Sequence, residues 1–332
     1  MRINKSDLFR KSVILPIIAA VSIVSVLAFI IPITSTTAAE FHYIQKFTTD
    51  GEFIASWGSN GTTDGKLLHP HGIAVDSTGN VYISDDEKNN IVKFTKDGKF
   101  ITKWGTGGTG NGQFNQPEDI GIDHSGNIFV VDEKNHNIQK FTSDGKFLGV
   151  LASKGIADGQ VRVPWGIEID SSGNIFVTEI KNDRIQKFTS DGKFITKWGT
   201  NGTGAGQFIH LHGIAVDSND NLYAVDQDNF KIEKFSNDGK SITKWGSYGC
   251  GEGQFREHHG IALDSHDNIY VVDSQNERIQ KFSNEGKFIK SWGTEGTGKG
   301  EFWLPHDIFI DSSDIVYVVD SGPVHHKKSP CK

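Results

Sequence analysis

Four histidines recur in register along the chain and could together hold a metal ion. Counted in steps of 47 residues, one column of the sequence reads His71, Glu118, Trp165, His212, His259 and His306. Imidazole nitrogens are common ligands of Zn²⁺, and a carboxylate can add an oxygen ligand. Residues this far apart meet only if the fold brings equivalent positions of successive repeats to one axis. A closed ring of repeats would therefore place zinc or another divalent metal among His71, His212, His259 and His306.

Simpler explanations of this column stay open. Duplication of one repeat copies a histidine without any function, and a histidine at the mouth of a strand can bond to backbone or water. Glu118 and Trp165 interrupt the histidines and are predicted ligand-binding residues, because positions that vary within a fixed frame are where loops and strand ends carry specificity. Trp165 would either plug the axis or form a stacking wall for a ligand.

The elements that would position this column form a repeat of 47 residues. Its starts lie at 70, 117, 164, 211, 258 and 305, and a tryptophan column keeps the same step, with Leu151 in the one gap. Each repeat holds four short β patterns, which in the first repeat cover 73–76, 81–85, 91–94 and 100–104 and are separated by turn signals. Four strands in a repeat of this length are typical of one propeller blade.

The two ends of the repeat region complete each other. Residues 42–47 and 52–57 match the third and fourth strands of a blade, and residues 308–311 and 316–320 match the first and second. We therefore predict an all-β fold, a six-bladed β-propeller of four-stranded blades over residues 40–320, with the last blade closed by both termini. Such closure leaves no open edge between the first and last blades.

Three further columns are predicted to be structural. Acidic residues end the first and second strand patterns of every repeat, as at Asp76 and Asp85, and carboxylates beside turns accept backbone N–H bonds. The tryptophans, such as Trp57, are expected to fill the interfaces between blades. A lysine column that includes Lys93 alternates with apolar neighbours and is expected to form a solvated strand face.

The first 39 residues are predicted to be a targeting segment. Residues 13–33 contain no charged side chain, follow four basic residues and precede the small residues at 36–39. This pattern is typical of a signal peptide cleaved near Ala39, or of an uncleaved membrane anchor, since 21 apolar residues can span a bilayer. Either interpretation places residues 40 onward outside the cytoplasm. Residues 321–332 are predicted to be a polar tail, whose Cys331 could pair with Cys250.

The charge of the chain excludes some function classes. The net charge is −7, which argues against a nucleic-acid partner, because binding to phosphates needs a basic surface. Two cysteines are too few for a disulfide scaffold or a multi-cysteine zinc module.

The repeat resembles the NHL family of six-bladed propellers. The resemblance rests on stretches such as Pro70-His71-Gly72-Ile73-Ala74-Val75-Asp76, Asn182-Asp183-Arg184-Ile185-Gln186-Lys187-Phe188 and Trp198-Gly199-Thr200, and it covers about residues 41–320. It implies the propeller fold, in which members act as protein-binding platforms, RNA binders or lyases. An acidic, exported chain is a poor candidate for RNA binding.

A second resemblance, to the peptide-amidating lyase propeller, bears on the histidines. Pro70-His71-Gly72 and Pro305-His306-Asp307 are similar to segments whose histidines bind zinc in that family, and Asp307 matches an aspartate with a catalytic role there. Glu87 stands where that family has a tyrosine, and no equivalent loop supplies its arginine. We therefore predict an exported or membrane-tethered platform for a protein, peptide or small-molecule ligand at the axial face. The alternative is a metal-dependent lyase or hydrolase with Asp307 as catalytic residue.

Overall fold

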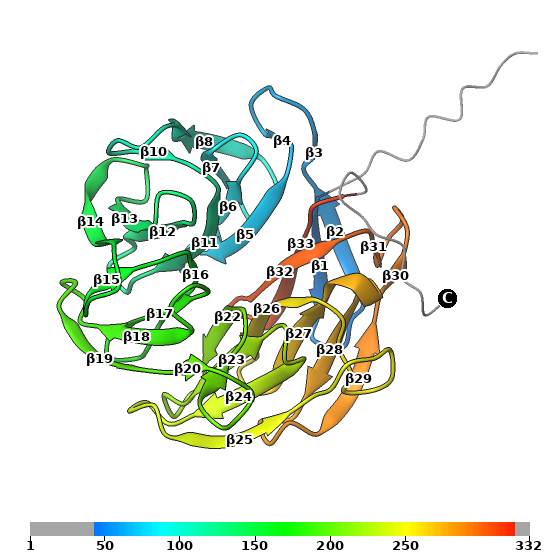
Figure 1. Cartoon of the computed structure of the whole chain (residues 1–332). Helices are drawn as coiled ribbons and strands as arrows, with labels where there is room; N and C mark the ends of the chain where they lie inside the picture. Colours follow the sequence, from blue (N-terminus) through cyan, green and yellow to red (C-terminus); the bar gives the residue numbers. More distant parts are fainter. Residues whose placement is uncertain (1–42, 323–332) are drawn as a thin grey trace, which may run out of the picture. The chain divides into compact units, whose positions relative to one another are not determined.

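The computed structural model describes residues 43–322, which form six antiparallel sheets around one axis (Figure 1). Each sheet is one blade of a propeller, and its first strand lies innermost. The predicted all-β, six-bladed fold is therefore confirmed. The targeting segment, Cys331 and residues 323–332 of the predicted tail lie outside the described residues. No helix within residues 43–322 is long and apolar enough to cross a membrane.

The blades follow the 47-residue repeat. Blade 1 contains β5 (Pro70–Val75), β6 (Val81–Asp85), β7 (Asn90–Phe94) and β8 (Phe100–Trp104). Blade 2 contains β11 (Pro117–Ile122), β12 (Ile128–Asp132), β13 (Asn137–Phe141) and β14 (Phe147–Lys154). Blade 3 contains β16 (Pro164–Ile169), β17 (Ile175–Glu179), β18 (Arg184–Phe188) and β19 (Phe194–Trp198).

The second half of the ring repeats this order. Blade 4 contains β22 (Leu211–Val216), β23 (Leu222–Asp226), β24 (Lys231–Phe235) and β25 (Ser241–Trp245). Blade 5 contains β26 (His258–Leu263), β27 (Ile269–Asp273), β28 (Arg278–Phe282) and β29 (Phe288–Trp292), with the 3-10 turn η1 (Ser274–Asn276). Blade 6 contains β32 (Pro305–Ile310), β33 (Ile315–Asp320), β1 (Ile44–Thr48) and β2 (Phe53–Trp57).

The glycine-rich links between blades form short parallel ribbons. Their paired strands are β3 (Ser59–Asn60) with β4 (Lys66–Leu67), β9 (Thr106–Gly107) with β10 (Gln113–Phe114), β20 (Thr200–Asn201) with β21 (Gln207–Phe208), and β30 (Thr294–Glu295) with β31 (Glu301–Phe302). In blade 2 the end of β14 pairs with β15 (Gln160–Val161), and in blade 4 a single bridge joins Tyr248 to Phe255. Each link buries one apolar side chain, such as Phe114, beneath the next blade.

Blade 6 is assembled from both ends of the repeat region. β1 pairs antiparallel with β33 over five residues, from Ile44 opposite Val319 to Thr48 opposite Ile315. In Figure 1 the blue strands β1 and β2 lie beside the orange and red strands β32 and β33. Ser321 Oγ then donates a hydrogen bond to the carbonyl of Pro70 in blade 1, at 2.7 Å.

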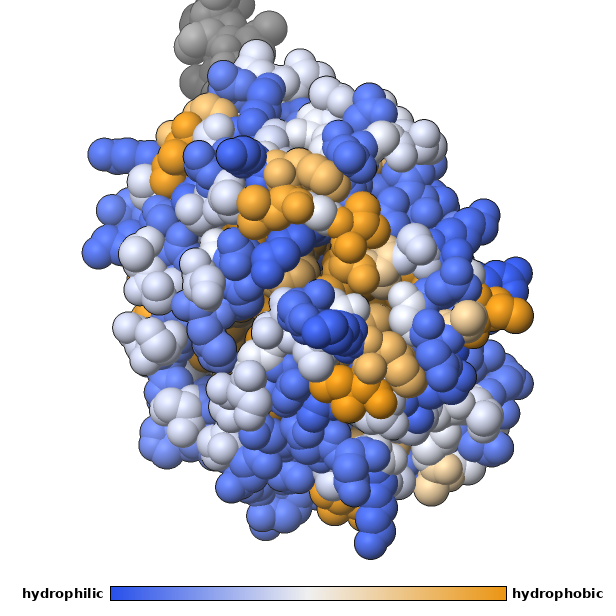
Figure 2. Space-filling model, turned by 90° about the vertical axis from the view of Figure 1, so that its left-hand side faces the viewer, coloured by the Kyte–Doolittle hydropathy of each residue, from blue (hydrophilic) through white to orange (hydrophobic). Residues whose placement is uncertain are grey.

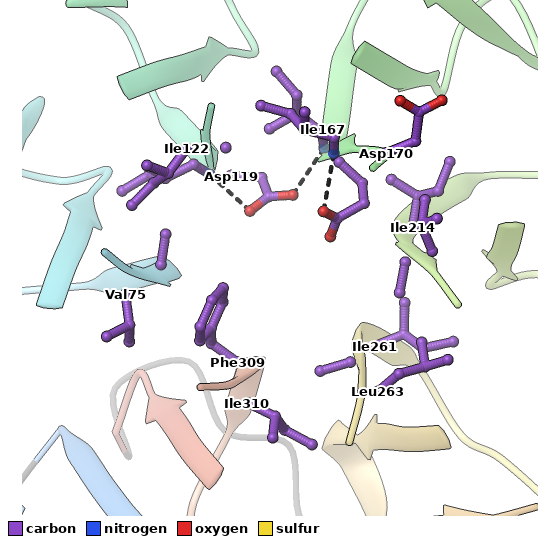
Figure 3. A pocket seen from close by; sticks show the side chains of 18 of the residues that line it. Val75, Asp119, Ile122, Ile167, Asp170, Ile214, Ile261, Leu263, Phe309 and Ile310 are labelled. Carbon is purple, nitrogen blue, oxygen red and sulfur yellow. Dashed lines mark hydrogen bonds between the residues drawn. The ribbon is translucent and has the colours of Figure 1, made fainter. Parts of the chain in front are cut away.

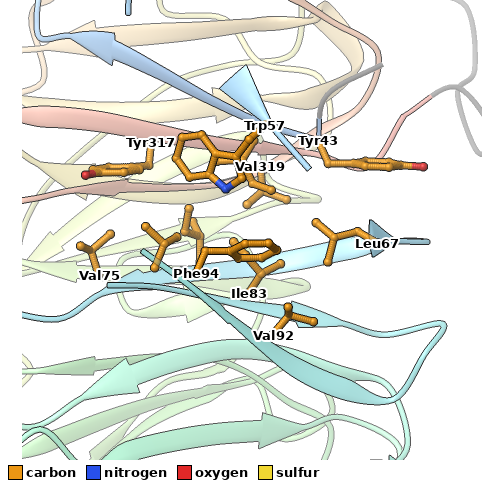
Figure 4. Close-up of a cluster of buried hydrophobic side chains, with 12 residues drawn as sticks. Tyr43, Trp57, Leu67, Val75, Ile83, Val92, Phe94, Tyr317 and Val319 are labelled. Atoms are coloured by element: carbon orange, nitrogen blue, oxygen red, sulfur yellow. The ribbon is translucent and has the colours of Figure 1, made fainter. Parts of the chain in front are cut away.

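The joint between blades 6 and 1 is a buried hydrophobic cluster (Figure 4). Trp57 and Tyr317 of blade 6 face Ile83 and Phe94 of blade 1. Burying aromatic and branched side chains stabilises such a joint by about 1.5–3 kcal/mol per side chain. Both terminal segments therefore contribute to the core.

The tryptophan column fills blade interfaces, as predicted. The Trp57 ring lies directly over Gly98, in the turn that precedes the last strand of the next blade, and a Cβ atom on Gly98 would lie 2.5 Å from the indole. Gly98 also has φ +78°, a conformation that glycine adopts without strain. The Asp-Gly turn signal thus has two purposes, since it reverses the chain and accommodates the neighbouring indole.

The acidic columns fix corners, again as predicted. Asp85 accepts the backbone N–H groups of Leu68 and Lys88 at 2.8 and 3.1 Å, and Asp76 accepts those of Thr78 and Asn80 at 2.9 Å. Carboxylates that accept backbone N–H bonds hold turns in place.

The prediction for the lysine column is wrong. Lys93, Lys187 and Lys281 are buried rather than solvated. Each lysine of the column lies 4.7–5.0 Å from the centre of an aromatic ring on the second strand of its own blade, as Lys93 does with Tyr82. The neighbouring blade covers this face, and cation–π contacts and ion pairs such as Lys281 with Asp264 offset the burial of the charge.

Candidate functional site

The innermost strands converge on the axis through an irregular stretch at the start of each strand. Pro70 pairs with Asp85 and Ile73 pairs with Ile83, so His71 and Gly72 lie opposite the single residue Ser84. A bulge of this kind bends the strand and redirects its side chains. The inner strands also approach closely, because a Cβ atom on Gly72 would lie 2.3 Å from the carbonyl oxygen of Glu118.

The column singled out in the sequence is brought together at this level. We call its members the axial layer: His71, Glu118, Trp165, His212, His259 and His306. The Trp165 indole stacks on His212 with ring centres 4.2 Å apart, and His259 stacks on His306 at 4.7 Å. The space left within the layer is about 20 Å³. The axial layer therefore fills the channel at its level.

One member of the axial layer is paired with a carboxylate. His71 Nδ1 lies 2.7 Å from Glu118 Oε2, and both side chains are buried. Burial disfavours the imidazolium, but the charge and the hydrogen bond of Glu118 outweigh it and raise the pKa of His71 to about 9. Burial also raises the pKa of Glu118, and His71 offsets part of this rise, so the two buried groups share a proton and titrate together.

The other three histidines are neutral. Burial lowers the pKa of His212, His259 and His306 well below the usual value, and the neighbouring imidazoles lower it further. His259 is oriented by Gln227 at 2.7 Å and Ser274 at 3.3 Å. Within the described residues, the ring nitrogens of His212 and His306 have no hydrogen-bond partner. Buried polar atoms of this kind are rare and often mark a site that binds something.

The stacked rings of the axial layer do not converge on one point in this structure. His259 and His306 are stacked with an angle of 9° between their planes, and His212 and His259 with an angle of 28°. Stacked imidazoles direct their lone pairs side by side, whereas Zn²⁺ needs nitrogens that converge at about 2.0–2.1 Å. Among residues 43–322, no group of three or more His, Cys, Asp or Glu side chains is placed to hold a metal ion.

A cavity of about 540 Å³ lies on the side of the axial layer where the inner strands begin. We call it the polar cavity. Its lining residues are His69, Asp86, Glu87, Gln116, Glu257, Gln275, Leu304 and His306. Asp86 accepts a hydrogen bond from His69 at 2.7 Å, and His306 contributes both to this cavity and to the axial layer. The loop that follows β6, with Asp86 and Glu87, therefore lines a cavity.

A second cavity, of about 570 Å³, lies where the inner strands end. We call it the apolar cavity after the isoleucine and leucine side chains that Figure 3 shows around it, although aspartate, glutamate and serine residues also line it and its surface is at least as polar as it is apolar. Asp119 and Phe309 point into it (Figure 3). Sequence reasoning missed Asp119 and Glu168 here. Alignment of the repeats could have revealed Glu168, because it is the one acidic residue in its column. The other members of this column are Ala74, Gly121, Ala215, Ala262 and Phe309.

Asp307, the predicted catalytic residue, lies between the axial layer and the apolar cavity. Its Oδ2 accepts the backbone N–H of Ile73 at 3.0 Å and so links blade 6 to blade 1. Burial raises the pKa of Asp307 well above the usual value, and Asp119 raises it further. Asp119 links blades 2 and 3 in the same way, through the N–H of Ile167 at 2.9 Å.

One face of the molecule is mostly hydrophilic with a few hydrophobic patches (Figure 2). On the face drawn in Figure 2, hydrophobic side chains gather around a hollow, and polar and charged side chains surround them.

Comparison with known proteins supports the fold. A model of the 6-bladed beta-propeller family matches residues 61–153, 166–245 and 261–324. No curated protein sequence matched the chain. The family match shows a six-bladed propeller and does not name the NHL family that the repeats resemble.

Solved structures with the same fold have varied functions. A catalytically inactive variant of virginiamycin B lyase from Staphylococcus aureus with quinupristin aligns over 80% of this chain and 78% of its own, with a TM-score of 0.55 and 20% identity. A gluconolactonase from Xanthomonas campestris aligns over 87% and 93%, with a TM-score of 0.57 and 12% identity. The nidogen/laminin complex contains a chain that aligns over 68% and 80%, with a TM-score of 0.54 and 19% identity. At these identities the likeness shows the fold alone.

Proposed function

The chain belongs to the 6-bladed beta-propeller family, and we propose that it is a binding platform for a peptide or small molecule with a basic group. The observation that carries this proposal is the polar cavity, which is large enough for such a ligand and is lined by carboxylate and amide side chains. Similar propellers include one crystallised with quinupristin and one in a complex of nidogen and laminin.

The negative charge of the polar cavity favours a cationic ligand. Asp86, Glu87 and Glu257 line it, and no lysine or arginine is among its described lining residues. A site whose charges have one sign attracts ligands of the opposite sign and increases their rate of association. A protonated amine or guanidinium group is therefore the favoured ligand group, with Gln116 and Gln275 as further hydrogen-bonding partners.

The axial layer supplies a rigid floor for this ligand. Its rings are stacked and the His71–Glu118 pair crosses it, so the layer closes the channel beneath the polar cavity. The floor also presents His306, whose ring nitrogens have no partner in the described part of the chain and can bond to a bound ligand.

We further propose that the platform acts outside the cytoplasm. The basic residues followed by an apolar stretch within residues 1–39 favour export, with or without a retained membrane anchor. Membership of the NHL type is part of the same proposal and rests on the recurrent sequence stretches of each blade.

Selection from a random peptide library with the immobilised whole chain tests the binding role. We expect enrichment of peptides with lysine or arginine, whose affinity falls at least tenfold for Glu87→Gln. Glu87 is exposed, so this substitution leaves the fold intact. The matched control is Glu285→Gln, which removes an exposed acid from the turn between β28 and β29, outside the lining of the polar cavity. Enriched peptides that bind both variants as well as the unsubstituted chain would contradict the proposed site.

A metal-dependent lyase or hydrolase is the second candidate. The partnerless nitrogens of His212 and His306 favour it, although the stacked rings would have to rotate before their nitrogens could converge on zinc. Elemental analysis and zinc titration of the whole chain decide between the candidates. Zinc bound at one equivalent and lost in both His71→Ala and His306→Ala supports the metal site. Absence of uptake on titration removes this candidate and leaves the platform unaffected.

A further inference from the structure

The apolar cavity has no part in the function proposed above, because the axial layer separates it from the polar cavity. Its volume of about 570 Å³ is within the usual range of small-molecule sites. Its walls come from the last residues of the inner strands, and Ile122, Ile169 and Leu263 expose part of their side chains to the cavity. Apolar walls that face an accessible cavity gain free energy when an apolar ligand covers them.

The inner end of the cavity is acidic. Asp119, Glu168 and Asp307 line it, and no described lysine or arginine forms an ion pair with any of the three. The acids nearer the mouth differ, since Asp123 and Asp217 are paired with Lys140 and Lys234 at 3.1 Å. Asp76 and Asp220, also near the mouth, accept hydrogen bonds from Thr78 and Ser171 and have no basic partner among the described residues, so carboxyl groups without a lysine line both ends of the cavity.

Glu168 has no structural purpose comparable to that of the other two acids. Asp119 and Asp307 each accept an N–H from the neighbouring blade, whereas Glu168 accepts only the N–H of the adjacent Ile169, at 2.9 Å. Three other blades carry alanine in its column, at Ala74, Ala215 and Ala262. The inner strand thus forms without a carboxylate at this position.

We propose that the apolar cavity is a second binding site, for an amphiphile that carries an ammonium group on an aliphatic body. The aliphatic part would lie along the isoleucine and leucine side chains, and the ammonium group would pair with Glu168 and with the free lone pairs of Asp119. The carboxyl group of Glu168 has its pKa raised by burial to about 7, so a bound cation would favour its ionised form.

Two other occupants fit this cavity less well. A metal ion would need three or more ligands at one point, and no such group exists among residues 43–322. An anionic amphiphile, such as a fatty acid, would place its carboxylate against three carboxyl groups without a basic partner. Shape and charge together favour an organic cation.

Three probes of equal length test the charge preference on the whole chain. Octylamine, octan-1-ol and octanoate share the aliphatic body and differ in the charge of the head group. Titration calorimetry at pH 8 is expected to rank them in this order, with octylamine at least tenfold tighter than octanoate. Equal affinity for octylamine and octanoate, or no binding of octylamine, would overturn the proposal.

Two variants locate the binding site. Glu168→Ala, which installs the residue found in three other blades, is expected to weaken octylamine at least tenfold and to leave octan-1-ol unchanged. Ala262→Phe, which installs the aromatic residue that blade 6 carries as Phe309, is expected to fill the cavity and weaken both probes. The control is Glu285→Ala, which removes an exposed acid that lines neither cavity and should leave octylamine binding unchanged. Octylamine binding that is lost in Glu87→Ala and retained in Glu168→Ala would place the amine in the polar cavity and refute the assignment to the apolar cavity.

Discussion

The buried pair of His71 and Glu118 makes a quantitative prediction about stability and pH. The substitution Glu118→Gln keeps the shape of the side chain and removes its charge. In the folded chain the pKa of His71 is about 9 instead of the ordinary value of 6.5. A difference of about 2.5 pKa units corresponds to about 3 kcal/mol of folding free energy. His71 is fully buried, so solvent screens little of this amount.

The raised pKa fixes the pH range of the effect. A group that binds its proton more tightly when folded stabilises the protein fully below its unfolded pKa, and this stabilisation is lost as the pH rises through the folded pKa. The contribution of His71 is therefore complete below about pH 6.5 and disappears above about pH 9. In Glu118→Gln, burial acts on His71 without a compensating charge, so the stabilisation is absent throughout.

Urea unfolding followed by tryptophan fluorescence at several pH values between 6 and 10 measures the difference. We expect the chain to be more stable than Glu118→Gln at pH 6, by at most about 3 kcal/mol because burial of the Glu118 carboxylate opposes the gain, and this gap to close or reverse by pH 10. Glu87→Gln, which removes an exposed acid, should show no such trend. Stability curves of the chain and of Glu118→Gln that stay parallel from pH 6 to 10 would refute the charged pair.

Three further outcomes are expected. Deletion of residues 40–57 should unfold or aggregate the protein, since it exposes the edge of blade 6 and removes the fully buried Phe47. Loss of the Phe47 side chain alone costs about 3–5 kcal/mol. A monomer with unchanged melting temperature would contradict closure of the ring by both termini. The segment Phe147–Leu151 should exchange amide hydrogens faster than Phe194–Trp198, because Leu151 covers the next blade with less surface than an indole; equal protection would contradict this. Trp165→Ala should lower the melting temperature, because the indole stacks within the axial layer; unchanged melting with lost ligand binding would instead make Trp165 a ligand contact.

The repeat made the fold predictable. A tryptophan, an acid–Gly turn and a strand-ending acid recur with one spacing, with Leu151 as the exception in the tryptophan column, and each has a local physical reason. Closure of the ring could be predicted from the number of strands in each repeat, because the first and last segments of the repeat region are complementary parts of one blade. The convergence of His71 with His212, His259 and His306 also followed, since equivalent positions of a closed ring face one axis.

Side-chain geometry within the channel could not be predicted in this way. The bulge at His71 and Gly72 breaks the alternation of faces that a regular strand would have, so sequence position alone does not give the direction of a side chain. The stacking of His259 on His306 depends on the width of the ring. The pattern of its own strand predicts that Lys93 is exposed to solvent. The adjacent blade, which the pattern of a single strand does not include, covers this side chain.

The pairing of β1 with β33 has a consequence for the order in which the protein can fold. Gln45, on β1, also donates a hydrogen bond to the carbonyl of Glu301, 256 positions later. The first strand of the propeller to leave the ribosome therefore has only its hairpin partner β2 until nearly all of the other strands have followed. Contacts so distant along the chain form slowly, because a very long loop must close before they contribute. Completion of the ring is thus a late event, and until then blade 6 exists only as two separate hairpins with exposed edges.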